Sequence, residues 1–254
     1  MAYSFSGLAV LLSVGAFAQS SDYEIGVALI QKGQMDAAAS VLARASESQP
    51  RDPRIWKALG VAYAAQKMYP LAEPAFQRAC ELAPRLEDAC YYHARALYAL
   101  DRYEDALAAL NRILAVEPKG WRIPLAIAQA LEALGRAPDA EKQFQLASST
   151  CQGKDAQPGV AYGLFLIRQG RLPEAIAPLE AVLKRFPESA EGHVYLGRAL
   201  LEQGSATAAI PHFEQALAIN SQSTQAHLLL AKAYLQVGRS AEAKPHLEAA
   251  KKYE

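Results

Sequence analysis

The sequence predicts an all-α fold made of consecutive helix pairs, and three observations lead to this prediction. A pattern of bulky and small residues returns about every 34 residues along almost the whole chain. Ala and Leu are abundant, and apolar and polar residues do not alternate over long stretches, which favours helices over strands. Gly and Pro recur where one helix would end and the next begin. Such a period is typical of repeat arrays, which work through their surface rather than through a catalytic centre.

The N-terminal segment resembles an export signal. Residues 7–18 form an apolar run of small residues that is too short to span a bilayer comfortably. The run ends in Ala16-Phe17-Ala18, the arrangement that signal peptidase prefers, so we expect a signal peptide over residues 1–18 and cleavage before Gln19. The mature chain would then be exported, to the periplasm or out of the cell.

Two alternatives to export remain open. Residues 1–7 contain no Lys or Arg, which a mis-assigned start codon would explain equally well, and the chain would then be cytoplasmic. The other alternative is a buried helix of the mature fold. It is weaker, because the repeat pattern begins only after Ala18.

The repeat pattern is most complete in residues 53–86, which are expected to form a helix, a short turn and a second helix. The defining residues are Trp56, Leu59, Gly60, Tyr63, Ala72, Phe76, Ala79 and Pro84. Six further copies are expected at residues 19–52, 87–120, 121–155, 156–189, 190–223 and 224–254. One extra residue enters within the polar stretch 148–158. The domain prediction is therefore a single array over residues 19–254.

The recurring small residues have a steric purpose. Two antiparallel helices approach closely only where one has Gly or Ala and a large side chain of the other fills the space. A second set of glycines falls in the expected turns, where a left-handed backbone can end the first helix of each pair. These turn glycines are Gly33, Gly135, Gly170, Gly204 and Gly238.

Residues 19–254 resemble the tetratricopeptide repeat family, whose W-x2-L-G-x2-Y…A-x3-F…P signature is matched without exception from Trp56 to Pro84. The resemblance implies a right-handed superhelical solenoid of about seven helix-turn-helix repeats, with the first helices lining a concave groove. Two residues, in the third and fourth repeats, depart from this pattern. Cys90 and Pro124 stand where the family usually has its tryptophan.

The faces that the family turns inward give a candidate partner-binding groove. Within each first helix, residues at i, i+4 and i+7 share one face. The groove residues predicted in this way are Lys57, Val61, Tyr91, Arg95, Tyr98, Gln129, Leu164, Arg198 and Lys232. Tyr91, Arg95 and Tyr98 form the patch with the residue types that dominate binding energy at interfaces. The alternative is that these aromatic rings pack between neighbouring repeats.

Charge and composition narrow the class of partner. The chain has 26 Lys and Arg against 26 Asp and Glu, without a basic stripe, so binding to nucleic acid or to an anionic membrane surface is disfavoured. No segment after residue 18 is long and apolar enough to cross a membrane. Some relatives hold acidic chaperone tails with clustered basic residues, whereas the basic residues here are scattered. A protein or peptide segment with apolar anchors suits this groove better.

No motif predicts catalysis, a cofactor or a metal site. The nucleophile, zinc-protease, phosphate-loop and dinucleotide motifs are absent. His193 and His227 are repeat equivalents, as are His212 and His246, and one repeat step is too long for two ligands of one metal ion. Polar packing of these four side chains is the expectation, and the chain is not expected to be an enzyme.

The cysteines show no zinc spacing. Cys80 and Cys90 lie on consecutive helices across a short turn, so an oxidising environment could join them in a disulfide. Alternatively, both are small core residues. Cys151 falls in the polar connection and is expected to be exposed.

The composite expectation is a non-catalytic adaptor or scaffold, monomeric, that holds a partner segment in its groove. The alternative is a structural component that self-assembles through its terminal repeats into a dimer or filament. Polar residues on the last helix favour the adaptor, because they resemble a solvated cap. They are Lys244, Glu248, Lys251 and Lys252.

Overall fold

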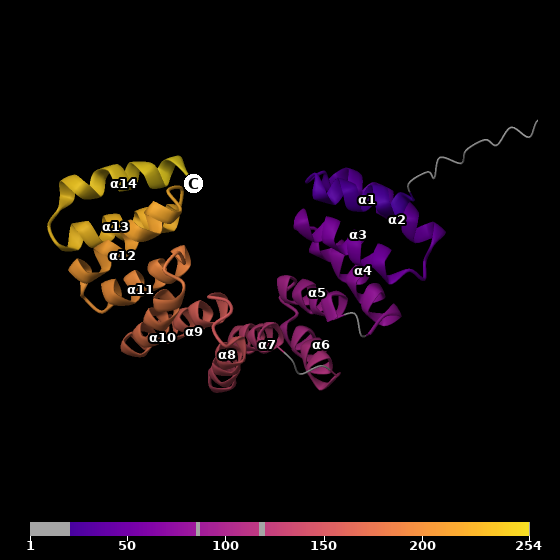
Figure 1. Cartoon of the computed structure of the whole chain (residues 1–254), viewed down its shortest axis with the longest axis horizontal. Coiled ribbons are helices and arrows are strands. Elements are labelled where there is room, and N and C mark those ends of the chain that lie inside the picture. The colour runs from indigo at the N-terminus through magenta and orange to yellow at the C-terminus, as the bar shows by residue number, and fades with distance from the viewer. Residues whose placement is uncertain (1–20, 85–86, 117–119, 254) are drawn as a thin grey trace, which may run out of the picture. The chain divides into compact units, whose positions relative to one another are not determined.

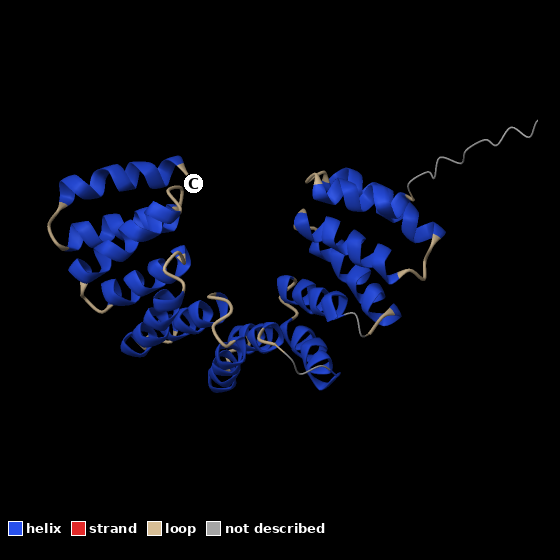
Figure 2. Ribbon diagram, in the orientation of Figure 1, coloured by secondary structure: helices blue, strands red, loops and turns tan. Residues whose placement is uncertain are grey.

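The fold is an all-α solenoid of helix pairs. The computed structural model describes residues 21–84, 87–116 and 120–253, and the predicted signal peptide over residues 1–18 lies outside them. Within the described residues every regular element is a helix and none is a strand (Figures 1 and 2). None of the helices described is long and apolar enough to cross a membrane.

The described residues contain 14 helices, two in each predicted repeat range. The first helices of the pairs are α1 (Asp22–Gln31), α3 (Pro53–Ala65), α5 (Glu87–Ala99), α7 (Arg122–Ala133), α9 (Gln157–Arg168), α11 (Ala190–Glu202) and α13 (Thr224–Gln236). The second helices are α2 (Met35–Ser48), α4 (Tyr69–Leu82), α6 (Tyr103–Val116), α8 (Ala137–Cys151), α10 (Leu172–Arg185), α12 (Ala206–Ile219) and α14 (Ser240–Lys252).

Side-chain caps begin several of the first helices. Ser21 and Glu24 form a reciprocal capping box at α1, with nitrogen–oxygen distances of 3.0 and 3.3 Å. Asp52 accepts a hydrogen bond from the Arg54 backbone N–H at 2.9 Å, just before Pro53 opens α3. Ser189 and Ser223 cap α11 and α13 in the same way. These caps satisfy backbone N–H groups that the helix itself cannot bond.

The turn between the two helices of each pair uses a left-handed backbone, as the turn glycines predict. Gly33, Gly135, Gly170, Gly204 and Gly238 have φ between 72° and 92°. At the matching places of the second and third repeats the structure has Lys67 and Asp101, with φ of 60° and 58°. The turn geometry is therefore common to all seven repeats, although two of them adopt it with a side chain present.

In four of the repeats, a glycine of the first helix meets a large residue of the second helix. A Cβ added to Gly60 would lie 2.6 Å from Phe76 Cδ1, and one added to Gly197 would lie 2.7 Å from Phe213 Cε1. The second-helix alanines are buried completely or almost completely. They are Ala38, Ala72, Ala106, Ala140, Ala175, Ala209 and Ala243. Close approach of the two helices thus depends on Gly and Ala at fixed places, as the sequence predicts.

The chain divides into two compact units, Met1–Ala89 and Cys90–Glu254, and the division falls within α5. In the first unit, the core contains Leu42, Leu59 and Ala62. In the second unit, a large core runs through the third to sixth repeats and a smaller one lies in the last two.

Replacing Lys67 with Gly is expected to raise the free energy of unfolding by about 1 kcal/mol, because Gly takes a positive φ without the steric cost that a side chain brings. Urea denaturation followed by circular dichroism measures the change. The matched control is Lys32→Gly, at a helix end with φ of −83°, where no gain is expected. A Lys67→Gly chain no more stable than the wild type would show that this turn carries no conformational cost.

Candidate functional site

Several first helices of neighbouring repeats contact each other within a unit. Helix α1 contacts α3, α9 contacts α11, and α11 contacts α13. The residues that these helices leave accessible therefore form a surface in each unit, which we call the first-helix face. Its central residues are Val61 in the first unit and Arg95, Gln129, Leu164, Arg198 and Lys232 in the second, all at least partly accessible.

The residues that flank these central positions at i and i+7 are mostly buried in the second unit. They are Tyr91, Leu125, Val160, Ile167, Val194 and Leu201. These side chains pack between helices instead of facing solvent. The first-helix face from α5 to α11 is therefore mainly polar, with Leu164 as its apolar member.

The patch of Tyr91, Arg95 and Tyr98 is largely used in packing. Tyr91 is 9% exposed and belongs to the large core of the second unit. Arg95 Nη1 donates a hydrogen bond to Tyr91 Oη at 3.2 Å, and the Arg122 guanidinium lies 4.6 Å from the centroid of the Tyr91 ring. Tyr98 packs edge-on against the Tyr103 ring at 5.1 Å. Of the three, only Arg95 is well exposed, and binding of a partner by this patch stays a prediction.

Charged and phenolic side chains line the face between α5 and α11. Arg168 Nη1 donates to both carboxylate oxygens of Glu132 at 3.3 Å and so links α9 to α7. Burial raises the pKa of Tyr98, and the Glu132 carboxylate adds to the effect. Burial also raises the pKa of Tyr195, while Arg168 and Arg198 act in the opposite direction. Arg168 is therefore within electrostatic range of both phenols, and the row is a connected polar surface.

Helix α13 has a different first-helix face, because its apolar residues are exposed. Leu228 and Leu235 are 49% and 50% exposed, and Lys232 is exposed between them. Residues at i, i+4 and i+7 share one face of a helix, so the three side chains lie together. On the adjacent α11, Arg198 Nε donates to Glu202 Oε1 at 2.7 Å. The seventh repeat thus exposes two large apolar side chains on this face.

In the first unit, the predicted groove residues are partly buried. Lys57 Nζ lies 4.0 Å from Asp88 Oδ2, at the limit of an ion pair, and Val61 and Ala64 are half-buried. An ion pair at such distance on an accessible surface contributes little to stability.

The structure places Cys90 and Cys151 in buried environments. The expectation that Cys151 is exposed is wrong, because α8 extends to this residue and buries it. Its Sγ lies 3.4 Å from the Asp155 carbonyl oxygen, which can accept a hydrogen bond from the thiol. A disulfide between Cys80 and Cys90 would join residues of the two units, and it stays a prediction.

The four histidines of the last two repeats form pairs that the sequence did not predict. His193 Nδ1 lies 3.3 Å from His212 Nδ1, and His227 Nδ1 lies 3.0 Å from His246 Nδ1. Each pair joins the two helices of one repeat, and its members are 19 residues apart in the sequence. Comparison of equivalent repeat positions instead matches His193 with His227 and His212 with His246. No group of three or more His, Cys, Asp or Glu side chains among the described residues could hold a metal ion.

Comparison with known proteins identifies the family. A tetratricopeptide repeat profile matches residues 23–87, 91–155 and 163–224, and a second such profile matches residues 200–254. The chain belongs to the tetratricopeptide repeat family. No curated protein matches it. Tetratricopeptide repeat folds generally serve as scaffolds for protein–protein interaction, and such proteins are generally non-catalytic adaptors.

Solved structures share the tetratricopeptide fold at low identity. A tetratricopeptide repeat protein from Parabacteroides merdae ATCC 43184 is 15% identical with a TM-score of 0.73, covering 91% of this chain and 93% of that one. A chain of the APC/C hetero-tetramer Cut9-Hcn1 is 17% identical with a TM-score of 0.69, covering 96% of this chain but 48% of that one, so this chain spans about half its length. YrrB, described as having an unusual peptide-binding site, is 18% identical with a TM-score of 0.51. The match covers 74% of this chain and 96% of YrrB.

Replacing Tyr91 with Ala is expected to lower the free energy of unfolding by about 3 kcal/mol, because it empties a buried aromatic site in the core of the second unit. Tyr91→Phe keeps the ring and removes only the hydrogen bond with Arg95, so it is expected to cost about 1 kcal/mol or less. Urea denaturation of both variants measures the difference. Equal stability of Tyr91→Ala and the wild type would place this ring outside the core and return it to the binding surface.

Proposed function

We propose that this tetratricopeptide repeat protein is an exported, non-catalytic scaffold that holds a segment of a partner protein on its first-helix face. The observation that carries the proposal is the exposure of two leucines, Leu228 and Leu235, on one side of α13. Large apolar side chains at such exposure lose contact with water when a partner covers them, and this stabilises the complex.

The residues around these leucines favour a segment that combines apolar anchors with polar contacts. Lys232 lies between the leucines and is exposed, so it suits a carboxylate or a backbone carbonyl of the partner. The neighbouring Arg198 and Glu202 on α11 offer both a donor and an acceptor. A helix with apolar residues at i, i+4 and i+7, or an extended segment with alternate apolar residues, would fit.

The family supports binding over catalysis. Proteins of this family are generally adaptors, and the similar protein YrrB is described as having a peptide-binding site. The charged groups of the first-helix face are explained by pairing on the surface, as Glu132 and Arg168 show. Export rests on the apolar run over residues 7–18 and the Ala16-Phe17-Ala18 sequence that follows the pattern of a cleavage site.

The first test of the scaffold is capture of partners from the native cell envelope by residues 19–254. Each half-exposed leucine is expected to contribute about 1 kcal/mol to binding, so Leu228→Gln/Leu235→Gln should weaken the captured complex at least about tenfold. Isothermal titration with the identified partner measures the dissociation constants.

The matched control is Leu71→Gln/Leu146→Gln, which changes two leucines that are 46% and 43% exposed on the second helices α4 and α8. This control is expected to bind like the wild type. Equal binding by all three proteins would contradict the proposed face, and loss of binding only in the control would move the site to the second helices.

Export predicts a processed N-terminus. Expression of the whole chain in a Gram-negative host is expected to give a mature protein that starts at Gln19 in the periplasmic fraction. N-terminal sequencing and fractionation measure this. Replacing Ala16 and Ala18 with Arg should block processing, because signal peptidase requires small residues there. An unprocessed wild-type chain confined to the cytoplasm would contradict export.

A further inference from the structure

His193 and His227 occupy the place of the repeat tryptophan and keep its hydrogen bond. Trp56 Nε1 donates to the carbonyl oxygen of Pro50, six residues earlier, at 2.9 Å. His193 Nε2 lies 3.0 Å from the Pro187 carbonyl oxygen, and His227 Nε2 lies 3.1 Å from that of Ser221, again six residues earlier. Since a carbonyl oxygen only accepts, Nε2 of each histidine must carry the proton. When these imidazoles are neutral, their Nδ1 atoms are therefore acceptors.

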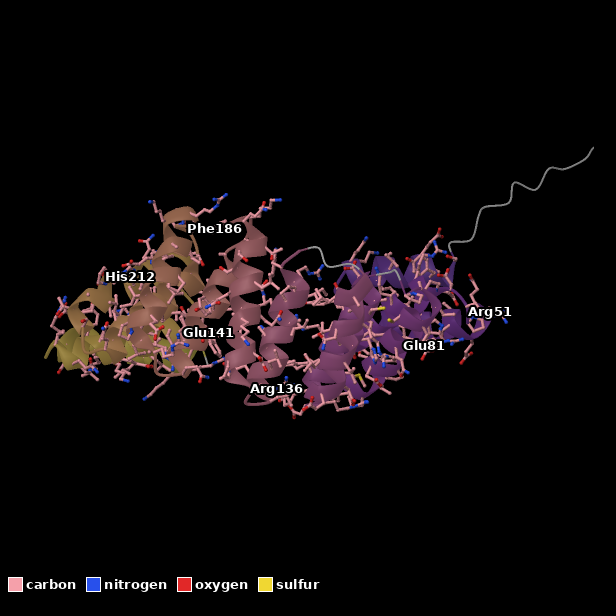
Figure 3. All side chains as sticks on the ribbon, turned by 90° about the horizontal axis from the view of Figure 1, so that it is seen from below. Arg51, Glu81, Arg136, Glu141, Phe186 and His212 are labelled. Atoms are coloured by element: carbon pink, nitrogen blue, oxygen red, sulfur yellow. The ribbon has the colours of Figure 1, made fainter. Side chains whose placement is uncertain are left out.

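Each of these acceptors faces the Nδ1 of a histidine on the second helix of the same repeat. The distances are 3.3 Å to His212 on α12 and 3.0 Å to His246 on α14. His212 is labelled in Figure 3. The ring centroids are 5.6 and 5.2 Å apart. For rings whose nitrogens are this close, the centroids are farthest apart when the two nitrogens point straight at each other, and the observed separations are close to that limit. The nitrogens therefore meet head-on, as in an N–H···N hydrogen bond, and not at the convergent angle needed for two ligands of one metal ion.

The proton count of each pair follows from this geometry. In the neutral pair, His212 or His246 donates its Nδ1–H to its partner, and its own Nε2 is unprotonated. A first added proton can bind there without disturbing the contact. A second added proton would have to bind between the two Nδ1 atoms, and two N–H groups would then oppose each other. In acid, where two independent histidines would each bind an added proton, each folded pair therefore binds one added proton instead of two.

The surroundings of the pairs include acidic and aromatic groups. The Glu180 carboxylate of α10 acts on His212, and that of Glu214 of α12 acts on His246, each favouring the protonated form. Burial, the largest effect, and the facing histidine outweigh them and lower the pKa of both His212 and His246. Tyr234 Oη donates to Glu214 at 2.7 Å, which partly satisfies that carboxylate.

The contacts of the seventh repeat also include two aromatic rings. The Tyr234 ring stacks on His246 at 5.9 Å, and the Tyr253 ring stacks on His227 at 6.0 Å.

The other repeats have no such pair at the matching places. The place of His212 and His246 is occupied by Gln143 in the fourth repeat and by Pro178 in the fifth. We propose that the two histidine pairs make the last two repeats, α11 to α14, an acid-sensitive end of the array, whose helix pairs loosen below the ordinary histidine pKa while the preceding repeats stay closed. The proposal goes beyond the partner-binding function and does not depend on it.

The sign of the effect follows from proton binding. Below the ordinary histidine pKa of about 6.5, the unfolded repeats bind more protons than the folded ones, so stability falls as pH falls. The loss continues until the folded pairs take up their last protons. Each pair is expected to raise the opening equilibrium constant by up to about tenfold for each pH unit in that window.

Hydrogen exchange of the whole chain at pH 7.5 and pH 5.0, with EDTA and with correction for intrinsic exchange rates, tests the proposal. Protection of α11 to α14 is expected to fall at least about tenfold relative to α7 to α10. The variant His212→Gln/His246→Gln uses the residue found in the fourth repeat and should lose this relative fall. The control His93→Gln removes a histidine of α5 and should keep it.

Two outcomes would overturn the proposal: an equal loss of protection in α7 to α10, or an unchanged fall in the double variant. Nitrogen-15 NMR of the wild-type histidines gives a second test that needs no variant. At pH 7.5 it is expected to show two imidazoles protonated at Nε2, His193 and His227, and two at Nδ1, His212 and His246. Four imidazoles with one common tautomer, titrating independently, would also overturn it.

Discussion

Four of the repeats depend on one steric contact, between a glycine of the first helix and a large residue of the second. A Cβ added to Gly26 would lie 2.4 Å from Leu42 Cγ, and one added to Gly163 would lie 2.5 Å from Leu179 Cγ. Helices with larger residues at these places could not pack at this separation. Because the contact recurs in these four repeats, it sets the spacing of their helix pairs and thereby the positions from which their part of the first-helix face is built.

The sequence predicts the fold well because each steric position is filled by a residue type with few alternatives. A buried Ala and a turn with positive φ appear in the sequence as Ala and Gly, and where the turn has Lys67 instead the period itself supplies the missing information. The first-helix face is predicted less well. Periodicity shows that Val160, Leu164 and Ile167 share a side of α9, but not how much of that side neighbouring helices cover. Helix α9 contacts α8, α10 and α11, and two of the three side chains are buried.

The histidine pairs show a second limit of comparing repeats. Equivalent residues such as His193 and His227 are easy to recognise because they recur at one period. Residues that touch within a repeat are separated by an offset that depends on the helix lengths and the turn, here 19 residues. That offset of 19 residues recurs in both of the last repeats, so it can be read from the sequence. The sequence alone does not show that residues at this offset touch, because that depends on which sides of the two helices meet.

The position of the repeat tryptophan tolerates wide variation, and the steric contact explains why. It holds Trp56, Cys90, Pro124, Gly159, His193 and His227 in successive repeats after the first. The close approach of the helices is fixed by the small residue four positions later, so the residue type at this place can vary more widely. An imidazole can therefore enter without loss of the fold. Sensitivity to protons can accordingly be confined to the repeats that contain the histidine pairs, while the array around them keeps a common geometry.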